Sequence, residues 1–198
     1  MIRDLMKGRF MVSYINTTHF SDLNACDPGE VVQRTGCGWD PETRRYTVTV
    51  WGYSYRVDTD RAEIIPEPGA PEAYEDMLYL FIIFYLIRAQ GKPAGGEWIS
   101  EKDIPGGAGF FRGPHTIPVS GITRRVGDDL DLFETLCRKL GGQPLDLADR
   151  SYYFEITPQV RVALLYWQGD EDFGCEAKML FDPAIGGWLP LDIVFALA

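Results

Sequence analysis

The pattern of apolar and polar positions is most pronounced between Met77 and Ile87, where every residue is apolar or aromatic. Asp76 precedes this run, while Arg88 and Gly91 follow it, and this order of charges and glycine marks the start and the stop of a helix. The run has no polar face, so a helix over about 74–90 must be covered on most sides by the rest of the protein. Spanning a bilayer takes about 20 such residues. The run is shorter than that, and we expect a central core helix.

The segment before this helix alternates in the manner of β-strands. From Tyr46 to Val50 every second residue is apolar, and threonines fill the positions between them, which predicts a strand with one buried face. Gly52 predicts a turn or bulge, followed by a second strand as far as Val57. A third short strand is expected over 62–65, before a proline-rich connector leads into the apolar helix.

Capping residues indicate helices on both sides of the apolar run. Asp27, followed three residues later by Glu30, predicts a short helix that ends near Arg34. Residues 10–23 fit an earlier helix only loosely. In the second half, two aspartates open the segment 128–140, whose apolar positions fall on one helical face and predict a longer helix.

The remaining elements of the second half are short. A helix is expected over 117–126, strands over 152–156, 160–167 and 179–181, and a last apolar helix that begins at Pro190. Strands, then helices, then strands again predict an α+β fold. We expect a mixed or antiparallel sheet packed around the central apolar helix, in one compact domain.

The composition limits the partners that the protein can have. Hydrophobic residues make up 45% of its 198 residues, which is enough for one substantial core. The formal net charge of -10 repels phosphate, so we expect neither nucleic acid nor an anionic membrane as a partner. Binding of a basic ligand or partner remains possible. Residues 1–10 lack the uninterrupted apolar stretch of a secretory signal, which favours a cytoplasmic protein.

Two groups of residues suggest metal or phosphate chemistry, and each has a plainer interpretation. The acidic residues 170–172 could bind a divalent cation, but the EF-hand spacing is absent, which favours a solvated hairpin turn. The glycines in 106–109 invite a phosphate-loop interpretation. The nucleotide-binding pattern breaks at Arg112, however, and a turn that lets Phe110 and Phe111 dock is preferred. The four cysteines lack metal-ligand spacing and are expected to be small buried residues.

The most specific candidate site lies in the loop from Trp98 to His115. Arg112 and His115 could present a cation and a titratable imidazole to an anionic ligand. With Trp98 and Phe111 as aromatic walls, a pocket between this loop and the central helix would suit a planar anionic cofactor. The alternative is that Arg112 pairs with a carboxylate and that His115 caps the loop.

Two other classes of function stay open. His115 with a carboxylate such as Asp103 or Asp170 would form the acid–base pair of an enzyme, provided that the two groups converge within hydrogen-bond reach. An acidic interaction domain would instead dock a basic partner and would show an exposed apolar patch. The sequence identifies no cofactor, no metal site and no set of catalytic residues.

A series of short motifs follows in one order along nearly the whole chain. In sequence they are Gly95–Ser100, Ile104–Gly107, Phe110–His115, Leu140–Gly142, Trp167, Gly169–Phe173, Leu180–Pro183 and Leu189–Asp192. This ordered set resembles the DUF3786 family, although no single motif is specific to it. The resemblance implies that residues 1–198 form a single DUF3786-like domain.

The same resemblance implies an accessory or ligand-binding protein of mainly anaerobic bacteria and archaea. Some members of the family carry, on the same chain, an iron-sulfur cluster domain of the kind seen in corrinoid proteins. That association implies a link to corrinoid, one-carbon or anaerobic redox metabolism, with a small anionic ligand or a corrinoid or iron-sulfur protein as partner. The cysteines of this chain lack the spacing that such a cluster requires.

Overall fold

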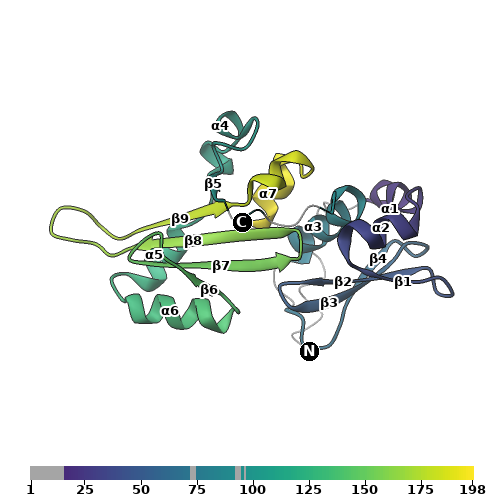
Figure 1. Ribbon diagram of the computed structural model, residues 1–198, viewed down its shortest axis with the longest axis horizontal. Helices are drawn as coiled ribbons and strands as arrows, with labels where there is room; N and C mark the ends of the chain where they lie inside the picture. Colours follow the sequence, from purple (N-terminus) through teal and green to yellow (C-terminus); the bar gives the residue numbers. More distant parts are fainter. Residues whose placement is uncertain (1–15, 72–74, 92–94, 96) are drawn as a thin grey trace, which may run out of the picture.

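The polypeptide folds into two halves, each of which carries one antiparallel sheet (Figure 1). The computed structural model describes residues 16–71, 75–91, 95 and 97–198. The first half contains α1 (Thr17–Asn24), α2 (Pro28–Thr35), β1 (Gly38–Asp40), β2 (Arg45–Val50), β3 (Tyr53–Asp58), β4 (Glu63–Pro66) and α3 (Glu75–Arg88). The second half contains β5 (Ile99–Ser100), α4 (Gly107–Phe110), the 3-10 turn η1 (Gly113–His115), α5 (Ser120–Val126), α6 (Leu130–Lys139), β6 (Gln143–Leu145), β7 (Arg150–Thr157), β8 (Val160–Trp167), β9 (Glu176–Phe181), the 3-10 turn η2 (Pro183–Gly187) and α7 (Leu191–Leu197).

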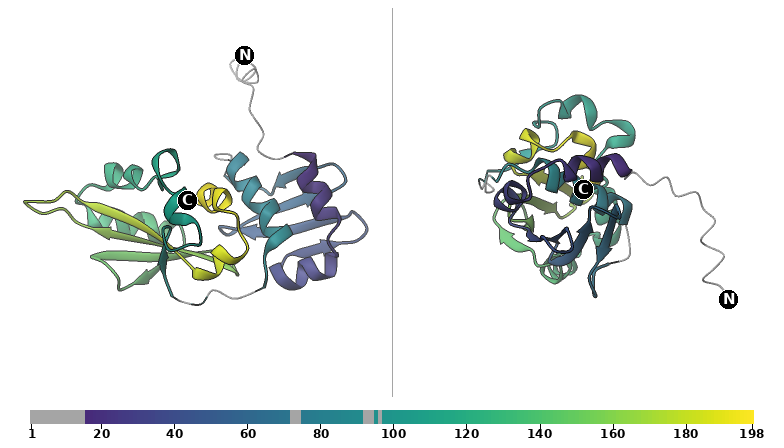
Figure 2. Two further views of the ribbon diagram at one scale, coloured as in Figure 1. Left: turned by 90° about the horizontal axis from the view of Figure 1, so that it is seen from above. Right: turned by 90° about the vertical axis from the view of Figure 1, so that its right-hand side faces the viewer.

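The first sheet is a meander in the order β1-β2-β3-β4. Its alternation is the one that the sequence predicts, because Tyr46, Val48 and Val50 are buried while Thr47 and Thr49 are exposed. Helices α1, α2 and α3 lie over the apolar face of this sheet (Figures 1 and 2). The opposite face carries the threonines, as expected for a sheet with one solvated side.

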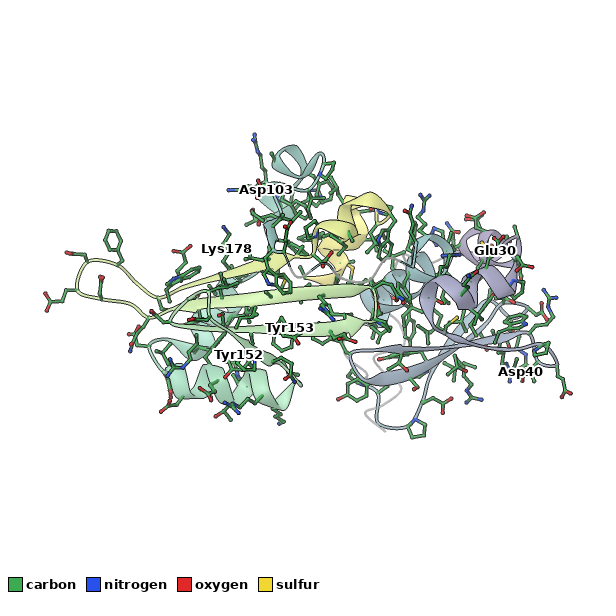
Figure 3. All side chains as sticks on the ribbon, in the orientation of Figure 1. Glu30, Asp40, Asp103, Tyr152, Tyr153 and Lys178 are labelled. Carbon is green, nitrogen blue, oxygen red and sulfur yellow. The ribbon has the colours of Figure 1, made fainter. Side chains whose placement is uncertain are left out.

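The second sheet has the order β5-β9-β8-β7-β6, and α5 and α6 cover one of its faces. The ring of Phe133 on α6 lies 4.7 Å from that of Tyr166 and 6.2 Å from that of Tyr152. On the opposite face Tyr153 is half-buried and Lys178 is exposed, and both are labelled in Figure 3. This sheet therefore also has one covered and one partly solvated side.

Two predicted helix starts are confirmed by the hydrogen bonds of their capping residues. The N–H of Glu30 donates to Asp27 Oδ1 at 3.0 Å, and Gly36 ends α2 with a φ of 71°. The N–H of Leu132 donates in the same way to Asp129 Oδ1 at 2.8 Å. Each cap satisfies an N–H group that has no partner within its helix.

Helix α3 is buried over most of its length. Phe81, Ile82, Ile83, Tyr85 and Leu86 are each 0% exposed, because α3 packs against α1 and α2 of its own half and against α7 of the other half. Figure 2 shows α7 between the two halves, beside α3. The sequence of α3 has no polar face because other helices cover it on several sides.

Polar contacts also join the halves. The N–H of Trp51, in the turn between β2 and β3, donates to Ile156 O on β7 at 3.0 Å. The hydroxyl of Tyr85 lies 2.7 Å from Thr35 O and also contacts the side chain of Gln159, at the β7–β8 turn. Burial raises the pKa of Tyr85 to about 12. The buried side chains of both halves form one continuous cluster.

The α+β class is confirmed, and the structure divides its strands between two antiparallel sheets. Six short elements were not predicted, namely β1, β5, β6, α4, η1 and η2, because two to five residues are too few to show a period. Of the loosely predicted first helix, residues 10–15 lie outside the described residues. Within the described residues, no helix is both long enough and apolar enough to cross a membrane.

Candidate functional site

A cavity of about 560 Å³ opens where the two halves meet. Its volume lies within the roughly 300–1,000 Å³ of small-molecule sites in proteins. Apolar and aromatic side chains line it, contributed by segments far apart in the sequence. These are Trp51, Pro71, Met77, Leu78 and Phe81 from the first half, with Pro118 and residues 195–198 from the second.

Trp51 is held against the cavity in an unusual backbone conformation. It occupies, with Gly52, the two-residue turn that closes the β2–β3 hairpin, and both residues have positive φ, 53° and 75°. Such turns favour asparagine and glycine, since the left-handed region costs other residues about 1–2 kcal/mol. The Trp51 ring packs 5.6 Å from the ring of Phe154 on β7. Contacts with the second half therefore hold the indole in place.

Helix α7 supplies the facing wall. It begins after Pro190, as the sequence predicts, and it buries Ile193 and Val194 completely. Phe195 and Leu197 are partly buried, and both line the cavity. Because α7 also packs on α3, the cavity lies between these two helices.

Three of the four residues that the sequence suggested for ligand binding lie in one segment beside this wall. Phe111 is buried, whereas Arg112 and His115 are exposed. The His115 ring stacks on Phe110 at 4.4 Å and meets Phe195 edge-on at 5.6 Å. His115 thus touches a residue that lines the cavity.

Trp98 has different neighbours from the other three residues. Its ring lies 6.3 Å from that of Tyr153, on the partly solvated face of the second sheet. The guanidinium of Arg161 lies 5.6 Å from the centre of the same Tyr153 ring. Trp98 is not among the residues that line the cavity.

Neither carboxylate considered as a partner for His115 contacts it. Asp103, beside α4 (Figure 3), accepts the N–H of Ser100 at 3.1 Å. Asp170 accepts the N–H groups of Asp172 and Phe173. Among the described residues, no hydrogen bond or ion pair joins His115 to a carboxylate. Arg112 likewise takes part in none of the ion pairs formed by those residues.

The glycine-rich segment before Arg112 forms a tight structural turn. Gly106 has a φ of 81° and precedes α4. A Cβ on Gly107 would lie 1.9 Å from Glu101 O, so only glycine fits there. The turn places the buried ring of Phe111 next to that of Phe110, with 5.1 Å between their centres. This arrangement confirms the interpretation of a turn that docks the two phenylalanines.

The acidic and thiol groups show no metal-binding geometry. No group of three or more His, Cys, Asp or Glu side chains that could hold a metal occurs within the described residues. All four cysteines are free, with Cys37 and Cys137 buried and Cys26 and Cys175 half-buried. Burial raises the pKa of Cys137 to about 12 and also raises that of Cys37. The two buried thiols are therefore poor nucleophiles at neutral pH.

Sequence reasoning did not identify the walls of the cavity. The signal that could have pointed to Trp51 is its place before Gly52 in a hairpin turn, where a large aromatic residue is unexpected. Helix α7 was predicted as an element, but its sequence of seven residues does not reveal that it packs on α3.

Comparison with known proteins gives one family. The model described as "Domain of unknown function (DUF3786)" matches residues 27–198. Neither the search of curated proteins nor the search of solved structures gave a match.

Proposed function

Since the chain belongs to the DUF3786 family, whose description assigns no activity, we propose a function from the geometry of the cavity. The protein is an accessory protein that binds a small, mainly apolar ligand between α3 and α7. The observation that carries this proposal is a cavity of about 560 Å³ whose lining comes from both halves of the molecule.

The chemistry of the lining supports an apolar ligand. Pockets for small molecules in proteins are lined predominantly by hydrophobic and aromatic side chains. Trp51, Met77 and Phe195 offer mainly carbon and sulfur surface. Burial of apolar ligand surface against these walls contributes about 25 cal/mol per Å².

The neighbouring segment supports a polar or anionic end on that ligand. His115 packs edge-on against Phe195 at 5.6 Å, and Arg112 is exposed three residues before it. A carboxylate or phosphate that projects from the cavity past Phe195 would come close to His115, and Arg112 in the same segment supplies a cation. Arg112 and His115 are accordingly our proposed anion contacts, and the buried ring of Phe111, which packs on Phe110, supports their segment.

The wider metabolic role rests on the family resemblance alone. That resemblance implies a link to corrinoid, one-carbon or anaerobic redox metabolism. A complete corrinoid is larger than the drug-sized ligands that fill cavities of this volume. We therefore propose that any such link runs through a smaller ligand or through a corrinoid or iron-sulfur protein partner.

The first test is native mass spectrometry, with an absorption spectrum, on protein purified without oxygen from its own source. We expect a co-purifying small molecule that denaturation releases. Protein at the mass of the chain alone, together with no binding of a defined apolar probe, would contradict the proposal.

The defined probe is cis-parinaric acid, a fluorescent polyene carboxylate. Ala196→Phe fills the cavity and should weaken binding at least about tenfold, which corresponds to 1.4 kcal/mol. Ala108→Phe is the matched control, because Ala108 is exposed on α4 and does not line the cavity. Equal binding by the two variants would place the probe elsewhere.

The anionic end has its own test. Arg112→Ala should weaken binding of cis-parinaric acid and leave binding of the matching alcohol unchanged, without loss of fold. If both probes bind this variant as they bind the original chain, Arg112 has no part in the site. The apolar cavity would remain supported in that case.

A further inference from the structure

The tip of the β8–β9 hairpin carries the most exposed large hydrophobic side chain of the described residues. Phe173 is 76% exposed, compared with 66% for Leu140 and 42% for Tyr53. The hairpin extends beyond the rest of the second half, at the end of the molecule farthest from the first half (Figure 1). Its position lies apart from the proposed ligand cavity, so the inference drawn from it goes beyond the proposed function.

The base of the tip is fastened to the body of the protein. The side-chain amide of Gln168 donates to Asp128 O at 2.9 Å, and the N–H of Gly169 donates to Asp128 Oδ1 at 2.9 Å. The N–H of Gln168 donates to Asp149 Oδ2 at 3.0 Å. Three hydrogen bonds to two neighbouring loops therefore fix the direction in which the hairpin leaves the sheet.

The tip itself is held closed by a second set of bonds. Asp170 Oδ1 accepts the N–H groups of Asp172 and Phe173 at 2.9 and 2.8 Å, and the N–H of Asp170 donates to Phe173 O at 2.8 Å. The exposed position of Phe173 is thus part of a defined turn. A turn whose backbone is already ordered loses less conformational entropy when a partner binds it than a mobile loop does.

We propose that this tip is a docking element, which inserts Phe173 into an apolar pocket on a protein partner with a basic surface. An aromatic side chain at the centre of a contact is the usual anchor of a protein interface. Asp170, Glu171 and Asp172 surround the anchor with negative charge, which a basic rim on the partner would complement. The same charges, and the net charge of the chain, repel phosphate groups of membranes and nucleic acids.

The first stage of the test is site-specific photocrosslinking in the source cells. The photoreactive residue p-benzoylphenylalanine replaces Phe173 in one full-length variant and Tyr53, an exposed tyrosine of the other half, in the control. We expect a protein adduct that forms at position 173 and not at position 53. Absence of such a specific adduct would overturn the proposal.

Capture alone is not sufficient, so the second stage measures binding of the purified partner. Phe173→Ala should weaken binding at least about tenfold, as loss of an interface anchor does, whereas Phe173→Tyr should keep most of it. Leu140→Ala, which removes another exposed apolar side chain, is the matched control. Equal affinities for Phe173→Ala and Leu140→Ala would overturn the proposal.

The charge component is tested separately. Glu171→Gln with Asp172→Gln removes two charges and leaves Asp170, which holds the turn, in place. This variant should bind the partner more weakly and with a weaker dependence on salt. An unchanged salt dependence would contradict the basic rim. Ala196→Phe, which fills the ligand cavity, should leave partner binding intact, so failure of one proposal is distinguishable from failure of the other.

Discussion

The β2–β3 and β8–β9 hairpins each carry an aromatic residue in the turn, but the side chains of these two residues lie in different surroundings. The β2–β3 turn directs Trp51 into the molecule, against Phe154 and the cavity. The β8–β9 turn directs Phe173 into solvent. Trp51 has a backbone conformation that costs energy, whereas Phe173 lies in a turn that Asp170 stabilises through hydrogen bonds.

This difference teaches how to interpret an aromatic residue in a turn. A left-handed tryptophan persists only where its ring gains more from packing than the backbone loses, so its explanation lies inside the chain. An exposed phenylalanine on a well-formed turn gains nothing comparable within the described residues. Its explanation is therefore sought in a partner.

The largest expected effect follows from removal of the inward ring. Trp51→Ala should lower the free energy of unfolding by about 3 kcal/mol, since the packing on Phe154 and part of the cavity wall are lost. Urea unfolding measures this difference. Trp51→Asn is the control, because asparagine tolerates positive φ, and it should be destabilised less than the alanine variant. Losses below about 1 kcal/mol for both variants would contradict the role of the ring.

A smaller effect is expected at the base of the outward turn. Gly169→Ala should cost about 2 kcal/mol, because its Cβ would lie 2.9 Å from Asp128 Oδ1 and from the backbone N of Cys175. Gly174→Ala is the matched control in the same turn, with open space around its Cβ, and should change stability by less than about 0.5 kcal/mol. Urea unfolding measures both variants. Equal stabilities would show that the base of the turn shifts to make room for the added Cβ.

Removal of the outward ring should have almost no effect on stability. Phe173→Ala is expected to change the free energy of unfolding by less than about 0.5 kcal/mol, since its side chain is mostly in solvent. The measurement is again urea unfolding. A loss above about 1 kcal/mol would show that the tip packs on the body of the protein and would remove the contrast with Trp51.

The smallest effect concerns the protonation of Asp170. Hydrogen bonds from the N–H groups of Asp172 and Phe173 lower the pKa of this carboxyl. Because the folded pKa is depressed, its contribution to stability is present above the unfolded value of about 3.9 and is lost as the pH falls through the lower folded pKa. An NMR titration of the Asp170 carboxyl checks this. The same group in urea-unfolded protein serves as reference, and equal pKa values would contradict the closed turn.

Local signals in the sequence predicted much of the fold. Asp27 and Asp129 cap the helices that they were expected to cap, and the alternation from Tyr46 to Val50 marks a strand with one buried face. Helix caps and strand alternation each depend on a few consecutive residues, so a single sequence shows them directly.

The candidate site could be predicted only in part. Phe111 and His115 were singled out from their loop, and both rings pack on Phe110, but neither lines the cavity, so their role in binding stays a prediction. The walls of the cavity escaped prediction, because Trp51, Phe81 and Phe195 are brought together by packing between distant elements. Contacts between residues so far apart in the sequence leave no period or motif in a single sequence.

The packing of α7 on α3 also has a consequence for the order of events during synthesis. The ribosome completes α3 and the whole five-stranded sheet before it produces α7. Until then one side of an almost wholly apolar helix lacks its final cover, and such transiently exposed surface is prone to aggregate. The nascent chain should thus depend on chaperones until α7 emerges, and the first half should acquire full protection from hydrogen exchange only after α7 has docked.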